Sequence, residues 1–230
     1  MTAKTKLTLI TIAVAILVAS AMVTQTVKSI DTQKTTPPSP PPRSGPIQVA
    51  LVGDSITGDY TYPSDLQEML GDNYSVGNFG SSGSTVSLSS WKPYMDQPVF
   101  QSALNFEPNI VVIMLGTNDD LQSLHQYNQT FQSDYAQLIC AFQKLASKPQ
   151  IWIATSPPIF SNSTDLSPAY MQNTIIPLTE GLAIHMNLPI INVNAAFGNQ
   201  SSYFQSDGVH PNSQGSAFIA NQVYLAITQK

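Results

Sequence analysis

Three side chains in this sequence have the types and spacing needed for nucleophilic acyl transfer. Ser55 follows a short apolar run, and Asp207 and His210 lie three residues apart near the C-terminus. A serine hydroxyl is a weak nucleophile near neutral pH and needs a base, a task that suits an imidazole with a pKa of about 6.5. A carboxylate that accepts a hydrogen bond from Nδ1–H holds the imidazole in one tautomer. One turn of chain between Asp207 and His210 can bring the base and its orienting acid together.

The same chemistry needs hydrogen-bond donors for the negative charge that develops on the carbonyl oxygen. Asn118, in Gly-Thr-Asn-Asp at 116–119, offers a side-chain amide, and the glycine-rich segment 78–85 offers backbone N–H groups. Each segment alone has an ordinary explanation as a turn or a helix cap. Their occurrence together and in order predicts a serine-based active site.

These segments must be positioned by a sheet, because each follows a predicted strand or lies in the last long loop. Short apolar runs predict strands at 47–52, 75–79, 110–115, 150–155 and 189–193. Apolar residues at helical spacing predict helices that include 66–70, 131–145 and 220–227. Strands alternating with helices predict an α/β fold, a three-layer α/β/α sandwich around a five-stranded parallel sheet. Sites in such sheets form beyond the carboxyl ends of the strands.

The composition of the chain excludes several classes of function and of site. The chain has 230 residues, enough for one ordinary domain, and only 10% of them are charged. From residue 47 onward four lysines face thirteen acidic residues, and there is no arginine. A nucleic-acid partner is therefore excluded, because binding phosphates requires clustered cations. One cysteine, Cys140, cannot form an internal disulfide or a zinc site of several thiolates.

The N-terminal part differs in composition from the rest. Residues 1–31 contain two early lysines and an uncharged run at 7–23, which fits either a signal peptide, cleaved after Ala-Ser-Ala at 19–21, or a membrane anchor. The positive-inside tendency predicts that the chain beyond this run is extracytoplasmic. Residues 32–46 hold six prolines and predict a semi-rigid linker. Residues 47–230 then form the catalytic domain.

The four segments together resemble the blocks of the SGNH, or GDSL-type, hydrolase family. Gly-Asp-Ser-Ile at 53–56 is similar to the first block, with Ile where Leu is commonest, and Asp-Gly-Val-His-Pro at 207–211 is similar to the last. The resemblance implies a flavodoxin-like fold and ester hydrolysis without a cofactor or metal. It implies that Ser55, His210 and Asp207 are the catalytic triad. It further implies that the Ser55 and Gly83 N–H groups and the Asn118 amide form the oxyanion hole, with Gly80 the weaker candidate for the glycine.

Substrate class is less narrowly defined by the sequence. The segments 150–159 and 203–207 look similar to family members that are sugar O-acetylesterases, which implies a short-chain, chiefly acetyl, ester on a glycan or small molecule. Two alternatives stay open: a lipase or thioesterase for longer acyl chains, and a catalytically silent glycan-binding module. Trp91 and Tyr94 either stack on a sugar ring or pack within the protein. His125 and His185 are interpreted as structural or surface residues, and Cys140 as a packing residue.

Overall fold

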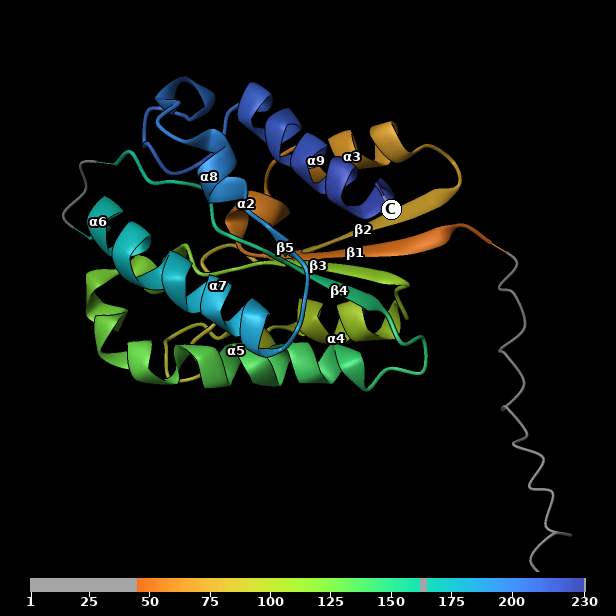
Figure 1. Cartoon of the computed structure of the whole chain (residues 1–230), viewed down its shortest axis with the longest axis horizontal. Helices are drawn as coiled ribbons and strands as arrows, with labels where there is room; N and C mark the ends of the chain where they lie inside the picture. Colours follow the sequence, from red (N-terminus) through yellow and green to blue (C-terminus); the bar gives the residue numbers. More distant parts are fainter. Residues whose placement is uncertain (1–44, 162–164, 230) are drawn as a thin grey trace, which may run out of the picture. The chain divides into compact units, whose positions relative to one another are not determined.

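The computed structural model describes residues 45–161 and 165–229. A parallel sheet of five strands in the order β2-β1-β3-β4-β5 lies at its centre (Figure 1). Its strands are β1 (Ile47–Gly53), β2 (Tyr74–Gly80), β3 (Ile110–Met114), β4 (Gln150–Ala154) and β5 (Ile190–Ile191). The predicted three-layer, five-stranded α/β/α class is confirmed.

The register of the sheet follows from the burial of its central strands. Every residue of β3 is buried, as expected for a strand that is covered on both faces. Gly53, at the end of β1, pairs with Gly80 of β2 on one side and with Met114 of β3 on the other. The carboxyl ends of β1, β2 and β3 therefore finish level with one another, and the loops that follow them leave the sheet at one edge.

Helices cover both faces of the sheet. In Figure 1, α3 (Tyr62–Leu70), α9 (Ser213–Thr228), α2 (Ser55–Gly58) and α8 (Val193–Phe197) lie on one side of the strands. The other side carries α4 (Pro98–Asn105), α5 (Asn128–Gln143), α6 (Pro168–Tyr170) and α7 (Ile176–His185). Met171–Ile175 forms a π-helical turn that leads into α7, and 3-10 turns occupy Tyr94–Asp96, Asn118–Asp120, Gln122–Tyr127 and Ser201–Tyr203.

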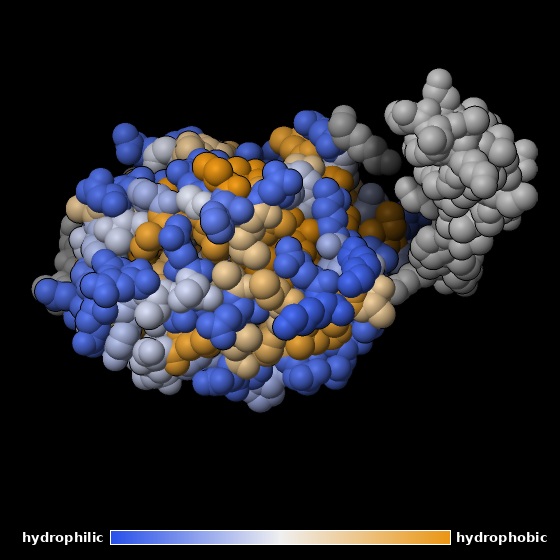
Figure 2. All heavy atoms as spheres, turned by 60° about the horizontal axis from the view of Figure 1, so that its bottom comes forward, coloured by the Kyte–Doolittle hydropathy of each residue, from blue (hydrophilic) through white to orange (hydrophobic). Residues whose placement is uncertain are grey.

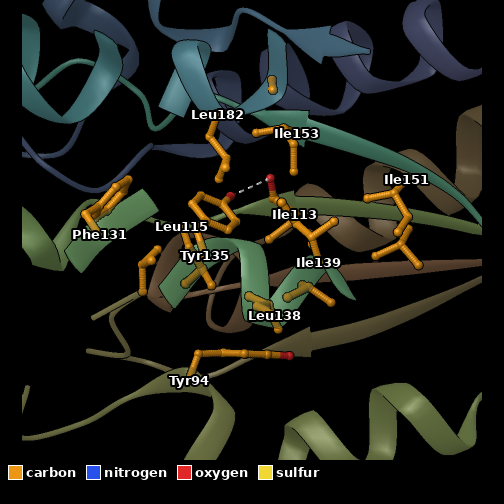
Figure 3. Close-up of a cluster of buried hydrophobic side chains, with 14 of the residues drawn as sticks. Tyr94, Ile113, Leu115, Phe131, Tyr135, Leu138, Ile139, Ile151, Ile153 and Leu182 are labelled. Atoms are coloured by element: carbon orange, nitrogen blue, oxygen red, sulfur yellow. Dashed lines mark hydrogen bonds between the residues drawn. The ribbon is translucent and has the colours of Figure 1, made fainter. Parts of the chain in front are cut away.

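Two hydrophobic clusters hold the layers together, one on each face. Alternate side chains of β3 point to opposite faces, so Ile113 joins the cluster under α5 and α7, while Val112 joins the cluster under α3 and α9. Figure 3 shows the first cluster, in which the Tyr135 hydroxyl of α5 donates a 3.4 Å hydrogen bond to the Ile113 carbonyl oxygen. Burial of these apolar surfaces is the main stabilising contribution to the domain.

The surface is a mixture of residue types. Figure 2 views the side that carries α4 and α5, where hydrophobic residues show between hydrophilic ones. Exposed large hydrophobic side chains are scattered over the described part of the chain: Ile47, Met69, Trp91, Ile184, Ile190 and Leu225. None of the helices in residues 45–161 and 165–229 is long and apolar enough to cross a bilayer.

One difference from the sequence-based expectation lies at the last strand. The strand predicted at 189–193 has only two residues, because the Asn192 side chain accepts a 3.0 Å hydrogen bond from Ala195 N–H and begins α8 at Val193. Helix α3 spans Tyr62–Leu70 and contains the predicted segment 66–70, with a proline in its first turn. The signal peptide or anchor at 1–31 and nearly all of the linker at 32–46 lie outside the described residues.

Candidate active site

Ser55 lies at the first residue of α2, directly beyond the carboxyl end of β1. Asp54 begins this helix: its Oδ1 accepts a 3.0 Å hydrogen bond from Ile56 N–H. The carbonyl oxygens of Asp54 and Ser55 accept from Gly58 and Asp59 N–H, both at 2.9 Å. The strand, the cap and these two turns fix the Ser55 backbone, and its side chain is half-buried.

A continuous chain of hydrogen bonds runs from Ser55 through His210 to Asp207. Ser55 Oγ lies 3.0 Å from His210 Nε2, and His210 Nδ1 lies 2.7 Å from Asp207 Oδ2. The His210 and Asp207 side chains are 29% and 46% exposed. The second ring nitrogen of His210 is thus occupied by a carboxylate, which leaves Nε2 facing the serine hydroxyl. The structure brings all three predicted residues together.

The loop that carries His210 is held by its own backbone. Asp207 Oδ1 accepts hydrogen bonds from Val209 N–H at 2.9 Å and His210 N–H at 3.0 Å, so the carboxylate is fixed by three donors. These hydrogen bonds lower the pKa of Asp207 despite its partial burial, which acts in the opposite direction. Asp207 therefore stays ionised at the pH values where an imidazole acts as a base.

Gly208 allows this loop to approach the loop after β4. It has a φ of 69°, and a Cβ at this position would lie 2.6 Å from the Phe160 carbonyl carbon. The close contact is used, because Phe160 N–H donates a 2.7 Å hydrogen bond to the Gly208 carbonyl oxygen. Only glycine combines this left-handed backbone with so little space.

The predicted oxyanion donors lie in the loops that follow β2 and β3, whose carboxyl ends are level with that of β1. Gly83 has a φ of 73° in the turn closed by the Ser84 N–H to Ser81 carbonyl hydrogen bond. Asn118 Nδ2 donates a 3.0 Å hydrogen bond to the Ser84 carbonyl oxygen, so its amide is held beside the glycine loop. One amide hydrogen is used in this contact, and the second is left for a ligand.

The Asp119 carboxylate, to which the sequence analysis gave no role, holds the backbone that follows the glycine-rich segment 78–85. The Asp119 oxygens accept hydrogen bonds from Val86 N–H and Ser87 N–H, both at 2.9 Å. Burial, with a smaller contribution from the neighbouring Asp54 carboxyl, raises the pKa of Asp119 to about 7, while the two backbone donors oppose the shift. Burial likewise raises the pKa of Asp54 to about 6. The signal for Asp119 in the sequence was its position next to Asn118.

Tyr60 is a second residue of the site that sequence reasoning missed. Its ring stacks on the His210 ring, with centroids 5.3 Å apart and planes inclined by 30°. Partial burial raises the pKa of Tyr60, and the nearby Asp207 carboxylate adds to this shift. Nothing in the spacing of Tyr60, five residues after Ser55, indicates this contact, because it depends on how the last loop folds back over α2.

The remaining singled-out residues lie elsewhere or inside the protein. His125 stacks on Tyr170 with centroids 3.4 Å apart, which agrees with a structural role. His185 is exposed at the end of α7, and Cys140 is half-buried on α5. Tyr94 is 1% exposed and donates a hydrogen bond to the Phe79 carbonyl oxygen, so it packs in the core. Across residues 45–161 and 165–229, no three His, Cys, Asp or Glu side chains are grouped to hold a metal ion.

A known protein family matches most of this chain. Residues 51–218 match the model of the GDSL-like lipase/acylhydrolase family, a span that contains Ser55, Gly83, Asn118, Asp207 and His210. The chain belongs to the GDSL-like lipase/acylhydrolase family. This confirms the resemblance seen in the sequence.

Relatives of this GDSL-like hydrolase are known from both sequence and structure. An acetylxylan esterase from Xylanibacter ruminicola is 34% identical over 213 residues, covering 82% of this chain and 44% of the relative. The chain thus spans less than half the length of that protein. A carbohydrate acetylesterase family member from Sinorhizobium meliloti has a similar fold, with a TM-score of 0.60 and 18% identity over 79% of this chain and 97% of that one. The inhibitor-bound aryl esterase of M. smegmatis also has a similar fold, with a TM-score of 0.63 and 17% identity over 78% of this chain and 99% of that one.

Proposed function

We propose that this hydrolase is an extracytoplasmic serine esterase that removes short acyl groups, chiefly acetyl, from a carbohydrate. The observation that carries the proposal is the hydrogen-bonded chain from Ser55 through His210 to Asp207, at 3.0 and 2.7 Å. A nucleophile within reach of a base, which is in turn oriented by a third group, is the arrangement that covalent acyl transfer requires. All three groups lie beyond the carboxyl edge of the sheet.

In the acylation step, Ser55 Oγ attacks the ester carbonyl carbon while its proton passes to His210 Nε2. Asp207 stabilises the imidazolium that forms. The carbonyl oxygen becomes an oxyanion and accepts hydrogen bonds from Ser55 N–H, Gly83 N–H and Asn118 Nδ2. His210 then gives its proton to the leaving alkoxide oxygen, and the carbon–oxygen bond breaks to release the alcohol. Removing one such oxyanion donor typically costs about 2.7–4 kcal/mol of transition-state stabilisation.

In the deacylation step, water replaces the alcohol. His210 Nε2 takes a proton from the water as its oxygen attacks the acyl carbon of the acyl-Ser55 ester. The second tetrahedral intermediate is held by the same three donors. It collapses when His210 returns the proton to Ser55 Oγ, which releases the carboxylic acid. The free enzyme is regenerated, and every atom of the ester and one water are accounted for in the acid and the alcohol.

Two observations support a carbohydrate ester as the substrate. The curated relative that matches most of this chain is named an acetylxylan esterase, although the chain spans 44% of its length. The His210 and Asp207 side chains are also substantially exposed, at 29% and 46%, which leaves the site accessible to a bulky substrate. A lipase or thioesterase would need additional apolar surface to bind a long acyl chain.

The proposed extracytoplasmic location is supported by the sequence of residues 1–46. Two lysines precede the uncharged run 7–23, and a proline-rich segment separates this run from the catalytic domain. Fusing residues 1–46 to a reporter enzyme that is active only outside the cytoplasm tests this part. Reporter activity is the expected result, and an inactive but intact fusion protein would contradict it.

The catalytic proposal is tested with the full chain, Ser55→Ala and the control Ser133→Ala, which removes an exposed hydroxyl on α5. Each protein is assayed on p-nitrophenyl esters from acetate to palmitate. We expect activity to peak at acetate and to fall steeply beyond four carbons, to be lost in Ser55→Ala, and to be unchanged in Ser133→Ala. Unfolding curves show whether Ser55→Ala keeps the fold, as expected for a half-buried hydroxyl whose hydrogen bond is to His210.

Other outcomes identify the alternatives. Activity that peaks at long acyl chains would replace the deacetylase by a lipase or thioesterase. Glycan binding without turnover, equal in wild type and Ser55→Ala, would indicate the silent binding module. Turnover by Ser55→Ala at the wild-type rate would contradict the mechanism itself.

A further inference from the structure

Trp91 lies in the loop between β2 and α4 and is 65% exposed. Among the Phe, Tyr and Trp side chains of residues 45–161 and 165–229, it alone is exposed. A single exposed apolar residue is common on protein surfaces and has no meaning alone. A tryptophan is nevertheless a large apolar surface to leave in water, and its meaning depends on where it lies.

Trp91 lies against the glycine that is proposed to bind the oxyanion. A Cβ added to Gly83 would be 3.2 Å from Cη2 of the Trp91 indole, so the ring covers the edge of this turn. Gly83 is in turn held near Asn118 through the Ser84 carbonyl oxygen. The ester carbonyl that reacts at Ser55 must reach these donors, so groups attached to it come near the turn that the indole covers.

The loop holds Trp91 in place from both sides. Thr85 N–H donates to the Lys92 carbonyl oxygen at 3.1 Å, and Tyr94 N–H donates to the Thr85 carbonyl oxygen at 2.9 Å. Lys92 Nζ donates a 2.7 Å hydrogen bond to the Ser82 carbonyl oxygen. Ser82 Oγ also hydrogen-bonds the Asp59 carboxylate on the opposite loop. The backbone at Trp91 is therefore preorganised, which reduces the entropy that a ligand must remove on binding.

The surroundings of the ring suit one kind of ligand. A pyranose ring has a flat face of C–H groups that packs on an indole, and hydroxyl groups at its edge that bond polar side chains. Lys92 and Asp59, which both hydrogen-bond Ser82 in the same turn, provide such groups near Trp91. Tyr94, the other aromatic residue predicted in this loop, is 1% exposed and cannot take this role.

We infer that Trp91 is the sugar-binding platform of this esterase and stacks on the ring that carries the ester. The inference rests on the proposed function and extends it from the acyl side of the substrate to the alcohol side. Trp91 acts on specificity and not on the chemical step, so its contribution depends on whether the alcohol contains a ring.

The test uses the full chain and the variants Trp91→Ala, Trp91→Phe and Ile184→Ala. The last variant is a control that truncates another exposed apolar side chain, on α7. The substrates are an acetylated xylo-oligosaccharide and ethyl acetate, which has the same acyl group without a ring. Aryl esters are avoided because their rings would also stack on Trp91.

We expect Trp91→Ala to lower kcat/KM on the acetylated oligosaccharide about tenfold, mainly through KM, since one large aromatic contact is worth a factor of this order. Turnover of ethyl acetate should stay within about twofold of wild type. Trp91→Phe should recover part of the loss, and Ile184→Ala should behave as wild type. An equal loss on both substrates would overturn the inference, because Trp91 would then act by supporting the Gly83 turn.

A binding measurement keeps the inference testable apart from turnover. The chain has two tryptophans, Trp91 and Trp152. In a Ser55→Ala, Trp152→Phe background the tryptophan emission comes from Trp91 alone, and the acetylated oligosaccharide should change it in a saturable way. Unchanged emission at concentrations that saturate the enzyme would overturn the inference.

If wild type turns over acetate esters but no acetylated sugar, the carbohydrate part of the proposed function fails along with this inference. If wild type deacetylates the sugar and Trp91→Ala does so equally well, this inference alone fails.

Discussion

The two sides of the site are built by different means. On the Ser55 side, Asp54 is 1% exposed and burial raises its pKa to about 6. On the Asp207–His210 side, the carboxylate is 46% exposed and hydrogen bonds lower its pKa. The nucleophile is thus placed by the core of the sheet, whereas the base is placed by a surface loop that Gly208, Asp207 and Tyr60 hold. Substitutions of the buried carboxyl groups that support the first side, Asp54 and Asp119, should affect folding. Substitutions in the loop on the second side should affect chemistry.

The largest expected effect comes from a substitution on the Asp207–His210 side of the site. Asp207→Asn keeps an oxygen for the two backbone donors but presents an amide to His210 Nδ1, which favours the wrong imidazole tautomer. We expect kcat on p-nitrophenyl acetate to fall by about 10³–10⁴-fold, as when a triad acid is replaced by its amide. The free energy of unfolding should change little, because the side chain is nearly half exposed. A loss below about tenfold would show that Asp207 does not orient the base.

On the Ser55 side of the site, the buried carboxyl groups should make the stability of the fold depend on pH. The Asp119 carboxyl has its pKa raised from 3.8 to about 7 by burial, so the folded chain keeps this proton after the unfolded chain has released it. Wild-type stability should therefore decrease as pH rises from about 4 to about 7, since the folded state binds more protons there. Asp54 acts in the same direction, up to about pH 6.

Replacing Asp119 isolates the contribution of its carboxyl group to this pH dependence. In Asp119→Asn, denaturant unfolding at several pH values should show a smaller decrease between about pH 4 and pH 7, by a few kcal/mol at most. Asp207, whose pKa is lowered, has the opposite sign: its stabilising contribution is present above its unfolded pKa and is lost as pH falls through its folded pKa. An unchanged pH slope in Asp119→Asn would show that its carboxyl is not the titrating group.

The smallest effect concerns Tyr60, which we regard as a positioning residue for His210. Tyr60→Ala removes the ring that stacks on the imidazole at 5.3 Å and should lower kcat several-fold, about 1 kcal/mol for one aromatic contact. Tyr60→Phe keeps the ring and should restore kcat. A Tyr60→Ala variant with the wild-type kcat would reduce this contact to simple packing.

The same division separates what the sequence could predict from what it could not. Strand β3 and the region after β1 were predictable, because a continuous apolar run followed by Gly-Asp-Ser has a local meaning. Asp207 and His210 were predictable because their spacing is short. The shortened β5 was missed because one side chain, Asn192, begins a helix where the apolar pattern continues. The contacts of Tyr60 with His210 and of Trp91 with the Gly83 turn were beyond sequence reasoning, since they depend on how loops fold over one another.

The central claim, that Ser55 is the nucleophile activated by His210, is tested most directly by covalent labelling. The full chain is treated with a fluorophosphonate, which phosphonylates an activated serine, and the product is mapped by peptide mass spectrometry. We predict one phosphonyl group per chain on Ser55, and at least a hundredfold slower labelling in His210→Ala, since a positioned base contributes about 10²–10⁴-fold. Labelling of a different residue, or of Ser55 at the same rate without His210, would contradict the claim.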